Sequence, residues 1–187
     1  MKVDYVVPYV DSSKPAWREL YLKYSRNFIG GSKEFKKRFD TNPLFKFSLR
    51  GVSKFIPWIN QLVLIVQSYD QIPDFIDTSK VRIVLHEEFI PKKFLPTFNA
   101  NTIEMFLHNI PGLSELFIYG NDDTYVFNNC EYNDFFIGAF PRNNIRFVKS
   151  ENDSYSRMLI NLNNKVWNKI YGKNFPRNDG YFTTFHV

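Results

Sequence analysis

Two adjacent carboxylates, Asp122 and Asp123, stand directly after the apolar run of residues 116–119. If that run is a buried strand, the pair lies at an edge of a sheet, where Mg²⁺ or Mn²⁺ could join it to a diphosphate group. An ordinary acidic turn is the alternative, and the spacing alone is compatible with both. The pair is the first candidate for metal-dependent chemistry.

A polar stripe is the second candidate. Asn101, Glu104 and His108 recur at i, i+3 and i+7 of segment 100–110, so a helix would carry them on one side. Glu104 and His108 are four residues apart, which would let the carboxylate orient the imidazole as a general base. A solvated helix face is the alternative interpretation.

Arg50 and two isolated histidines complete the set. Arg50 stands late in segment 43–55, where its guanidinium could clamp phosphate oxygens or favour the helix C-terminus through the helix dipole. His86 follows the apolar run 81–85, and His186 is the penultimate residue. The residues next to each histidine in the sequence do not indicate a functional site, and a lone histidine is more often structural.

Buried strands must position these residues. Short apolar runs cover residues 4–10, 62–66, 81–85 and 116–119, and segments with helical periodicity separate them. This alternation predicts an α/β fold of the Rossmann-like type, with a mostly parallel sheet flanked by helices and ligands beyond the carboxyl ends of the strands. Asp11 and Asp122 both follow such ends.

Each expected helix has an apolar side. In segment 43–55 the residues near one face are Leu44, Phe47, Val52 and Phe55, with Pro57 ending the helix. In segment 100–110 they are Ile103, Phe106, Leu107 and Ile110. Residues 145–149 predict a further strand. Residues 156–171 predict a helix that ends at Gly172 and buries Leu159, Leu162, Val166 and Ile170.

The composition bounds the class of protein. A length of 187 residues fits one domain, or one domain plus a small appendage. A net charge of +5 suits an anionic partner such as a nucleotide, a phosphate or a membrane surface. Outside the basic run 33–38 the lysines and arginines are dispersed, which argues against nucleic-acid binding. The single Cys130 excludes an intramolecular disulfide, and no apolar run approaches the ~20 residues of a membrane span. These features predict a cytoplasmic protein, with a charge that suits peripheral association at the inner face of the membrane.

Four stretches together resemble one protein family. They are VVPYVDSSKPAW, RFDTNPLFKFSLRGVSKFIPWINQLVLIV, IPDFI and LPTFNANTIEMFLHNIPGLSELFIYGNDDTYVF. In this order they resemble the Stealth family of sugar-phosphate transferases, closely over residues 4–136. That family includes bacterial capsule hexose-1-phosphate transferases and the animal enzyme that places N-acetylglucosamine-1-phosphate on lysosomal glycoproteins. A match of this length is far more specific than any single motif within it.

The resemblance carries over to individual residues. Asp11, Pro15 and Trp17 match the first block of the family, with Ser12 in place of its usual glycine. The matches to the second block are Arg50, Asn99, Asn101, Glu104, His108, Asn121, Asp122 and Asp123. GYFTTFHV resembles the beginning of the third block, with His186 at its first histidine. The rest of that block and the fourth block have no counterpart in this chain, so the resemblance implies a single transferase domain over residues 1–187 that is truncated at its C-terminus.

The resemblance implies transfer of a sugar-1-phosphate from a UDP-sugar to a hydroxyl of a saccharide acceptor, free or lipid-linked, in capsule or exopolysaccharide synthesis. UMP is released. Such displacement at phosphorus needs charge neutralisation and in-line positioning more than covalent chemistry. Asp122 and Asp123 would hold Mg²⁺ or Mn²⁺, and Arg50 would stabilise phosphate charge. His108, oriented by Glu104, is one candidate base and Asp11 is the other. The remaining expected site residues are Asn99, Asn101, Asn121 and Trp17 for substrate binding and His186 for catalysis.

Two other functions stay open. A metal-dependent glycosyltransferase on a similar fold would attack the anomeric carbon and release UDP instead of UMP. A nucleotide-sugar-binding module without turnover would follow from the missing blocks, and for the same reason we expect the chain to bind a UDP-sugar better than it turns it over. Identification of the released nucleotide separates these functions.

Overall fold

The computed structural model describes residues 1–24, 42–142, 144–149, 165–172 and 181–186. The chain divides into two compact units, Met1–Ala139 and Phe140–Val187. The basic run 33–38 and the expected core residues Leu159 and Leu162 lie outside the described residues.

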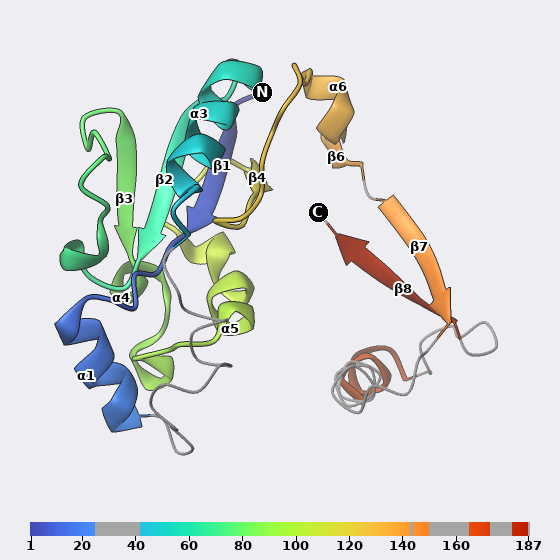
Figure 1. Ribbon diagram of the computed structural model, residues 1–187. Coiled ribbons are helices and arrows are strands. Elements are labelled where there is room, and N and C mark those ends of the chain that lie inside the picture. The colour runs from blue at the N-terminus through green and yellow to red at the C-terminus, as the bar shows by residue number, and fades with distance from the viewer. Residues whose placement is uncertain (25–41, 143, 150–164, 173–180, 187) are drawn as a thin grey trace. The chain divides into compact units, whose positions relative to one another are not determined.

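The first unit is built on a parallel sheet. Strands β1 (Val3–Pro8), β2 (Gln61–Val66), β3 (Val81–Leu85) and β4 (Leu116–Tyr119) form one four-stranded sheet in the order β3-β2-β1-β4. Every neighbouring pair in it is parallel. The arrowheads of β1, β2 and β3 therefore point the same way, toward the side where helix α1 (Pro15–Tyr24) lies (Figure 1). The predicted α/β class is confirmed.

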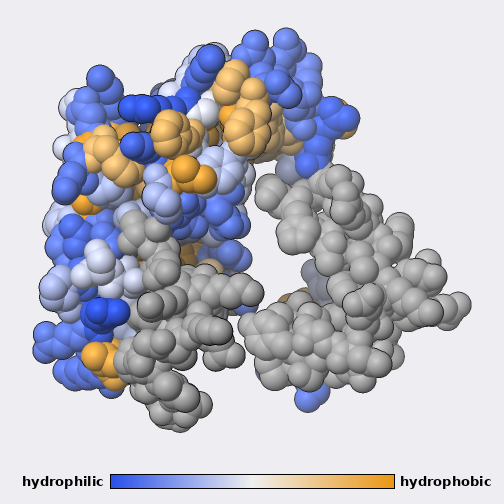
Figure 2. Space-filling model, viewed as in Figure 1, coloured by the Kyte–Doolittle hydropathy of each residue, from blue (hydrophilic) through white to orange (hydrophobic). Residues whose placement is uncertain are grey.

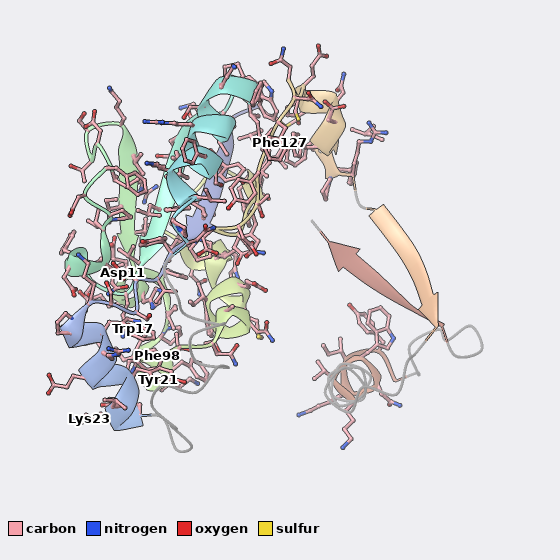
Figure 3. The ribbon with its side chains drawn as sticks, viewed as in Figure 1. Asp11, Trp17, Tyr21, Lys23, Phe98 and Phe127 are labelled. Atoms are coloured by element: carbon pink, nitrogen blue, oxygen red, sulfur yellow. The ribbon has the colours of Figure 1, made fainter. Side chains whose placement is uncertain are left out.

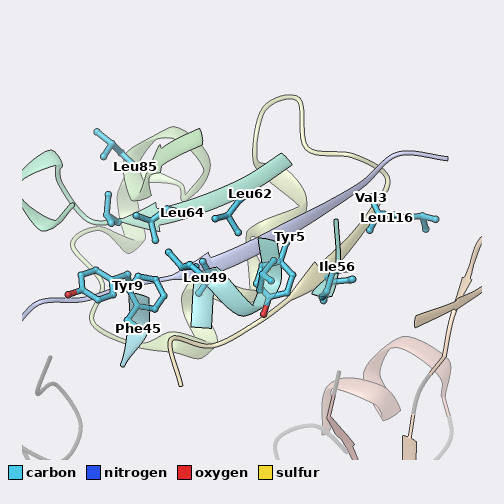
Figure 4. Packing of buried hydrophobic residues seen from close by; sticks show 14 of the residues in the cluster. Val3, Tyr5, Tyr9, Phe45, Leu49, Ile56, Leu62, Leu64, Leu85 and Leu116 are labelled. Atoms are coloured by element: carbon cyan, nitrogen blue, oxygen red, sulfur yellow. The ribbon is translucent and has the colours of Figure 1, made fainter. Parts of the chain in front are cut away.

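Apolar side chains on both faces of the sheet explain why its strands are continuous hydrophobic runs. On one face, Tyr5, Val7 and Leu64 pack with residues of helix α3 (Phe45–Phe55), as Figure 4 shows in part. On the other face, the β-strand side chains pack with Phe89, Leu107 and Ile110. These come from helix α4 (His86–Phe89), the 3₁₀ turn η3 (Leu107–Asn109) and the residue after it. The unit is a three-layer α/β/α arrangement.

Helix α3 buries only part of the side that its periodicity predicts. Val52 is in the core and Phe55 is partly buried, as predicted, whereas Leu44 and Phe47 are about half exposed at 51% and 49%. Phe45 and Leu49 are buried in their place. Figure 2 shows hydrophobic side chains exposed on the face that carries this helix. The physical reason is an aromatic contact, because the ring of Phe45 stacks on Tyr9 of the segment after β1 with centroids 4.6 Å apart. That contact sets the rotation of the helix.

The other short elements of this unit lie in its loops. They are the 3₁₀ turns η1 (Tyr69–Gln71) and η2 (Lys92–Phe94), helices α5 (Ala100–Met105) and α6 (Tyr132–Phe135), and strand β5 (Phe136–Ile137). Among the described helices, none combines the length and the apolar character needed to cross a membrane.

The second unit contains β6 (Phe140–Pro141), β7 (Asn144–Lys149) and β8 (Tyr181–His186). The strand predicted over 145–149 is confirmed as β7, which pairs antiparallel with β8. Of the helix predicted over 156–171, residues 165–171 are described and are helical. The expected burial of Val166 and Ile170 is wrong, because they are 57% and 64% exposed. In this stretch Trp167, which packs on Tyr171 with ring centroids 4.2 Å apart, is the partly buried residue instead.

Candidate functional site

The acidic pair occupies the centre of a tight turn after β4. The backbone N–H of Asn121 donates to Thr124 Oγ1 at 3.1 Å, and the backbone N–H of Thr124 donates back to the Asn121 carbonyl at 3.0 Å. Asp122 and Asp123 are the two residues between these anchors. We call residues 121–124 the acidic turn. Because both ends are hydrogen-bonded to each other, the two carboxylates are presented by a closed loop.

Helix α3 and the residues before it hold the acidic turn in place. Ser48 Oγ donates to the Thr124 carbonyl at 2.5 Å, and Asn42 Nδ2 donates to the Asp122 carbonyl at 2.8 Å. At Gly51 a β-carbon would stand 2.6 Å from the carbonyl oxygen of Val126, which is closer than real side chains approach. The glycine therefore allows the helix to lie directly on the segment that leaves the turn.

A second loop, after β1, carries Asp11. Its Oδ1 accepts hydrogen bonds from the backbone N–H and the hydroxyl of Ser13, at 2.9 and 2.6 Å. The fully buried Gln71 holds the backbone of this loop, because its Oε1 accepts from the Asp11 N–H at 2.7 Å and its Nε2 donates to the Asp11 carbonyl at 3.3 Å. The position of Asp11 thus depends on a residue 60 positions away in the sequence.

Tyr9 links the two loops electrostatically. Burial raises the pKa of its hydroxyl to about 12, and the negative charges of Asp11 and Asp122 contribute to this rise. Both carboxylates therefore lie within electrostatic reach of one phenol. The loops after β1 and β4 converge, as expected for strands at which the order of a sheet reverses.

The environment of Asp122 favours a bound cation. Burial raises the pKa of this carboxyl above its ordinary value, and the neighbouring charge of Asp123 adds to the effect. A cation between the two side chains would relieve that repulsion. The described residues contain no cluster of three or more His, Cys, Asp or Glu side chains arranged for a metal. Two carboxylates still fit Mg²⁺, which protein sites commonly bind through one or two carboxylates and substrate phosphates.

A pocket of about 290 Å³ opens beside the acidic turn. The carboxyl ends of all four strands contribute to its wall through residues 8–10, Gln67, His86 and Tyr119. The other lining residues are Trp17, Thr97, Phe98, Ala100, Ile103, Asn121 and Asp122. It lies where an open α/β sheet ordinarily binds its ligand, and its volume is close to the lower end of the roughly 300–1,000 Å³ typical of ligand pockets.

Aromatic rings form one side of this pocket. Trp17 of α1 and Phe98 line it, in an edge-to-face arrangement with centroids 5.4 Å apart, and Trp17 stacks on Tyr21 of the same helix with centroids 5.2 Å apart. Figure 3 shows these three residues together, with Asp11 near the beginning of α1. Flat apolar surfaces of this kind are suited to stack on a base or a sugar ring.

The predicted site residues are distributed unevenly around the pocket. Trp17, Asn121 and Asp122 line it, and Asp123 is adjacent in the acidic turn. Asn99 caps helix α5, since its side-chain oxygen accepts from the backbone N–H of Asn101 at 3.0 Å. Asn101 itself is exposed. The cap alone accounts for an asparagine at position 99.

Glu104 and His108 do not share one regular helix. Helix α5 ends at Met105, and the chain continues through the 3₁₀ turn η3. The apolar side of the segment matches the prediction, because Leu107 and Ile110 are buried and Ile103 and Phe106 are partly buried against the same cluster. On the polar side, Glu104 accepts a hydrogen bond from the Tyr119 hydroxyl at 3.0 Å, while His108 is exposed. Glu104 therefore connects to the pocket through Tyr119.

Arg50 does not line this pocket, and His186 is a residue of the second unit. Arg50 is exposed and contacts the Phe47 ring, with its guanidinium carbon 5.6 Å from the ring centroid. It lines a second hollow together with Lys46, Lys54, Phe75, Asp77 and Lys80. The rotation of α3 set by Phe45 turns Ser48 and Gly51, and not Arg50, toward the acidic turn. His186 belongs to the second unit, where it pairs with Asn144.

Two further residues, Gln67 and His86, line the pocket, and the sequence pattern does not predict this position for them. Within the described part of the chain, Gln67 Oε1 and His86 Nδ1 are buried and have no hydrogen-bond partner. Most buried polar atoms are paired, so the two unpaired ones in this pocket are candidates for contact with a ligand. The only signal in the sequence is their position, since each stands directly after a buried strand.

The pH dependence of stability should report the burial of His86. Burial lowers the pKa of this histidine from 6.5 to about 4, so between these pH values the unfolded chain binds a proton that the folded chain does not. The folded state should lose about 3 kcal/mol as the pH falls through this range and regain it as the pH rises. Urea unfolding at pH 7 and pH 4, with His86→Phe as the control that removes only this titration, measures the difference. Identical pH profiles for the two proteins would show that the histidine titrates normally.

Comparison with known proteins identifies a family match and several relatives. Residues 38–143 match the family model described as "Stealth protein CR2, conserved region 2". The receptor polysaccharide phosphotransferase WefC of Streptococcus gordonii is 33% identical over 190 residues, which cover 98% of this chain and 56% of that protein. The capsular polysaccharide phosphotransferase eps5J of Streptococcus thermophilus is 37% identical over 145 residues, or 75% of this chain and 60% of that protein.

A third relative is also longer than the part of it that this chain matches. The capsular polysaccharide phosphotransferase of Actinobacillus suis is 35% identical over 140 residues, which cover 72% of this chain and 37% of that protein. The chain thus spans between about a third and three fifths of the length of these relatives. The family model covers more than half of the chain and includes the acidic turn. The chain belongs to the Stealth family.

Proposed function

We propose that this chain binds a UDP-sugar and transfers its sugar-1-phosphate to a hydroxyl of a saccharide acceptor, with release of UMP, in the synthesis of a capsular or other surface polysaccharide. The observation that carries the proposal is the position of Asp122, which lines the pocket between the ends of β1 and β4 with Asp123 next to it. The relatives are named as polysaccharide phosphotransferases, which supports the reaction class.

The carboxylates of the acidic turn would hold Mg²⁺ or Mn²⁺. The raised pKa of Asp122, caused by burial and by Asp123, supports a cation at this position. Such an ion, when bound, neutralises charge on a diphosphate and polarises its phosphoryl oxygens. Asp122 and Asp123 would thereby position the diphosphate at the mouth of the pocket.

The chemical step is a displacement at phosphorus. The acceptor hydroxyl oxygen attacks the phosphorus that carries the sugar, the bond from that phosphorus to the bridging oxygen breaks, and UMP leaves with the electron pair. The hydroxyl proton passes to a base. Asp11 is better placed for this role than His108, because its charge acts on Tyr9 in the pocket wall together with that of Asp122. His108 is exposed beyond the end of α5.

We also propose an acceptor and a place of reaction. A growing polysaccharide, free or lipid-linked, would supply the hydroxyl. The net charge of +5 favours binding of the chain to an anionic membrane surface. We propose that the reaction takes place on the cytoplasmic side, where the UDP-sugar is available.

Identification of the released nucleotide tests this proposal. The chain incubated with Mg²⁺, a panel of UDP-sugars and an oligosaccharide acceptor should release UMP, detected by anion-exchange chromatography. Asp11→Asn should lower the rate of UMP release by about 100-fold, because removal of a catalytic base commonly costs 10²–10⁴. His108→Gln should leave the rate within about twofold, since its side chain is exposed outside the pocket.

Each alternative function predicts another product. Release of UDP would identify a glycosyltransferase that attacks the anomeric carbon. Binding of UDP-sugars without release of either nucleotide, at high protein concentration and with every acceptor, would identify a binding module and contradict the proposed transfer.

A further inference from the structure

The pocket beside the acidic turn contains polar atoms that a ligand can satisfy. Gln67 Oε1 and His86 Nδ1 are buried in its wall and have no hydrogen-bond partner among the described residues. His86 is 7% exposed and packs edge-on against Phe89. A buried polar atom without a hydrogen-bond partner destabilises the folded protein. Its presence in a pocket therefore favours binding of a ligand that forms the missing hydrogen bond.

The charge of the pocket wall indicates which part of a nucleotide sugar it takes. No lysine or arginine is among the described residues that line it, and its one carboxylate, Asp122, lies in the acidic turn. A diphosphate would meet no cationic side chain among these lining residues to balance its charge. A neutral, flat group with hydrogen-bonding edges would satisfy them, because aromatic side chains stack on bases and neutral polar groups bind base edges.

We propose that this pocket holds the uracil base of the donor, with Gln67 and His86 binding its imide edge and the aromatic side formed by Trp17 and Phe98 supporting its ring. This inference rests on the proposed function and assigns the base-binding part of the same site. The diphosphate then extends from the base toward the acidic turn, whose residue Asp122 shares the pocket wall.

The hydrogen-bonding groups of uracil match the two unpaired atoms. The N3–H of uracil donates and its O4 accepts. Gln67 Oε1 can accept only. Burial lowers the pKa of His86 to about 4, so the imidazole is neutral at pH 7 and its Nδ1 can carry the proton that O4 requires. One acceptor and one donor in the protein thus face one donor and one acceptor in the base.

Uridine and UMP are the probes that test this assignment. Calorimetric titration without metal should show both binding to the chain, and Gln67→Met and His86→Phe should each weaken that binding by about tenfold, the usual effect of losing one hydrogen bond. Both variants should melt at the same temperature as the wild type or at a higher one, because each removes a buried atom that has no partner. A purely structural role would lower the melting temperature instead.

A matched control is the second glutamine at this edge of the sheet. Gln71 is fully buried like the target atoms, but its amide is bonded on both sides to the backbone of Asp11. Gln71→Met should therefore lower the melting temperature, which shows that the measurement detects the loss of a bonded amide.

Three results bear on the inference separately from the proposed function. Wild-type affinity for uridine in both variants overturns the base assignment, even where UDP still binds with Mg²⁺ and UMP is still released. A glucose-1-phosphate affinity that falls in the variants while uridine binding does not change also overturns it, because the pocket then takes the sugar. The wild type could also bind uridine, with an affinity that both substitutions lower, and yet release no UMP. That result contradicts the transfer reaction and supports the assignment of the pocket to the base.

Discussion

Replacing Asp122 or Asp123 with asparagine should weaken the Mg²⁺-dependent binding of UDP by about 100-fold, because loss of a group that only supports a metal ligand already costs 10–100-fold in metal affinity. Each change removes one of the two anionic oxygen ligands that the acidic turn offers. The fold should be preserved, since backbone and hydroxyl contacts of Asn121 and Thr124 close the turn and asparagine keeps a side-chain oxygen that can accept from the backbone. Calorimetric titration of UDP with and without Mg²⁺ measures the effect.

The control for this experiment is Asp74→Asn, which removes the same charge from an exposed residue outside the pocket. Its affinity for UDP should stay within about twofold of the wild type, because exposed charges at a distance are screened by salt. The metal assignment fails if Asp122→Asn and Asp123→Asn bind UDP as tightly as Asp74→Asn in the presence of Mg²⁺.

Gly120→Ala should destabilise the protein by about 3 kcal/mol or more, at the upper end of what overpacking a core usually costs. A β-carbon at this position would overlap the hydroxyl of Tyr5 and stand 2.6 Å from its Cζ atom. Tyr5 is 1% exposed in the centre of the larger hydrophobic cluster, so its ring has no space into which it can move. Urea unfolding monitored by circular dichroism measures the loss.

Gly112→Ala separates this packing effect from backbone strain. Gly112 has a φ of +66°, and the nearest atom to an added β-carbon is 3.7 Å away, so the substitution should cost only about 1 kcal/mol for the left-handed backbone. Equal losses in the two variants would show that Gly120 does not make the close contact. Because Gly120 also donates to the Val6 carbonyl at 2.9 Å, its displacement should reduce UDP binding at the acidic turn that follows it.

The sequence by itself determined the four strands of the parallel sheet, the α/β class and the family, although β1 ends at Pro8 and not at residue 10. The runs over residues 62–66, 81–85 and 116–119 are strands within one residue of their expected ends, because a strand buried on both faces must be apolar at consecutive positions. The convergence of the Asp11 and Asp122 loops was also predictable, since parallel strands deliver their carboxyl ends to one edge.

Only the tertiary structure decided which side chains meet at that edge. Two neighbouring faces of α3 are almost equally apolar, so the sequence pattern does not decide which of them is buried. The contact of Phe45 with Tyr9, 36 positions earlier in the chain, decides which face lies in the core. That rotation directed Ser48 and Gly51 to the acidic turn and Arg50 to another surface. Likewise, Gln67 and His86 have no distinctive sequence pattern. Whether a polar atom is buried and unpaired depends on segments distant in the chain, which come together only when the chain folds.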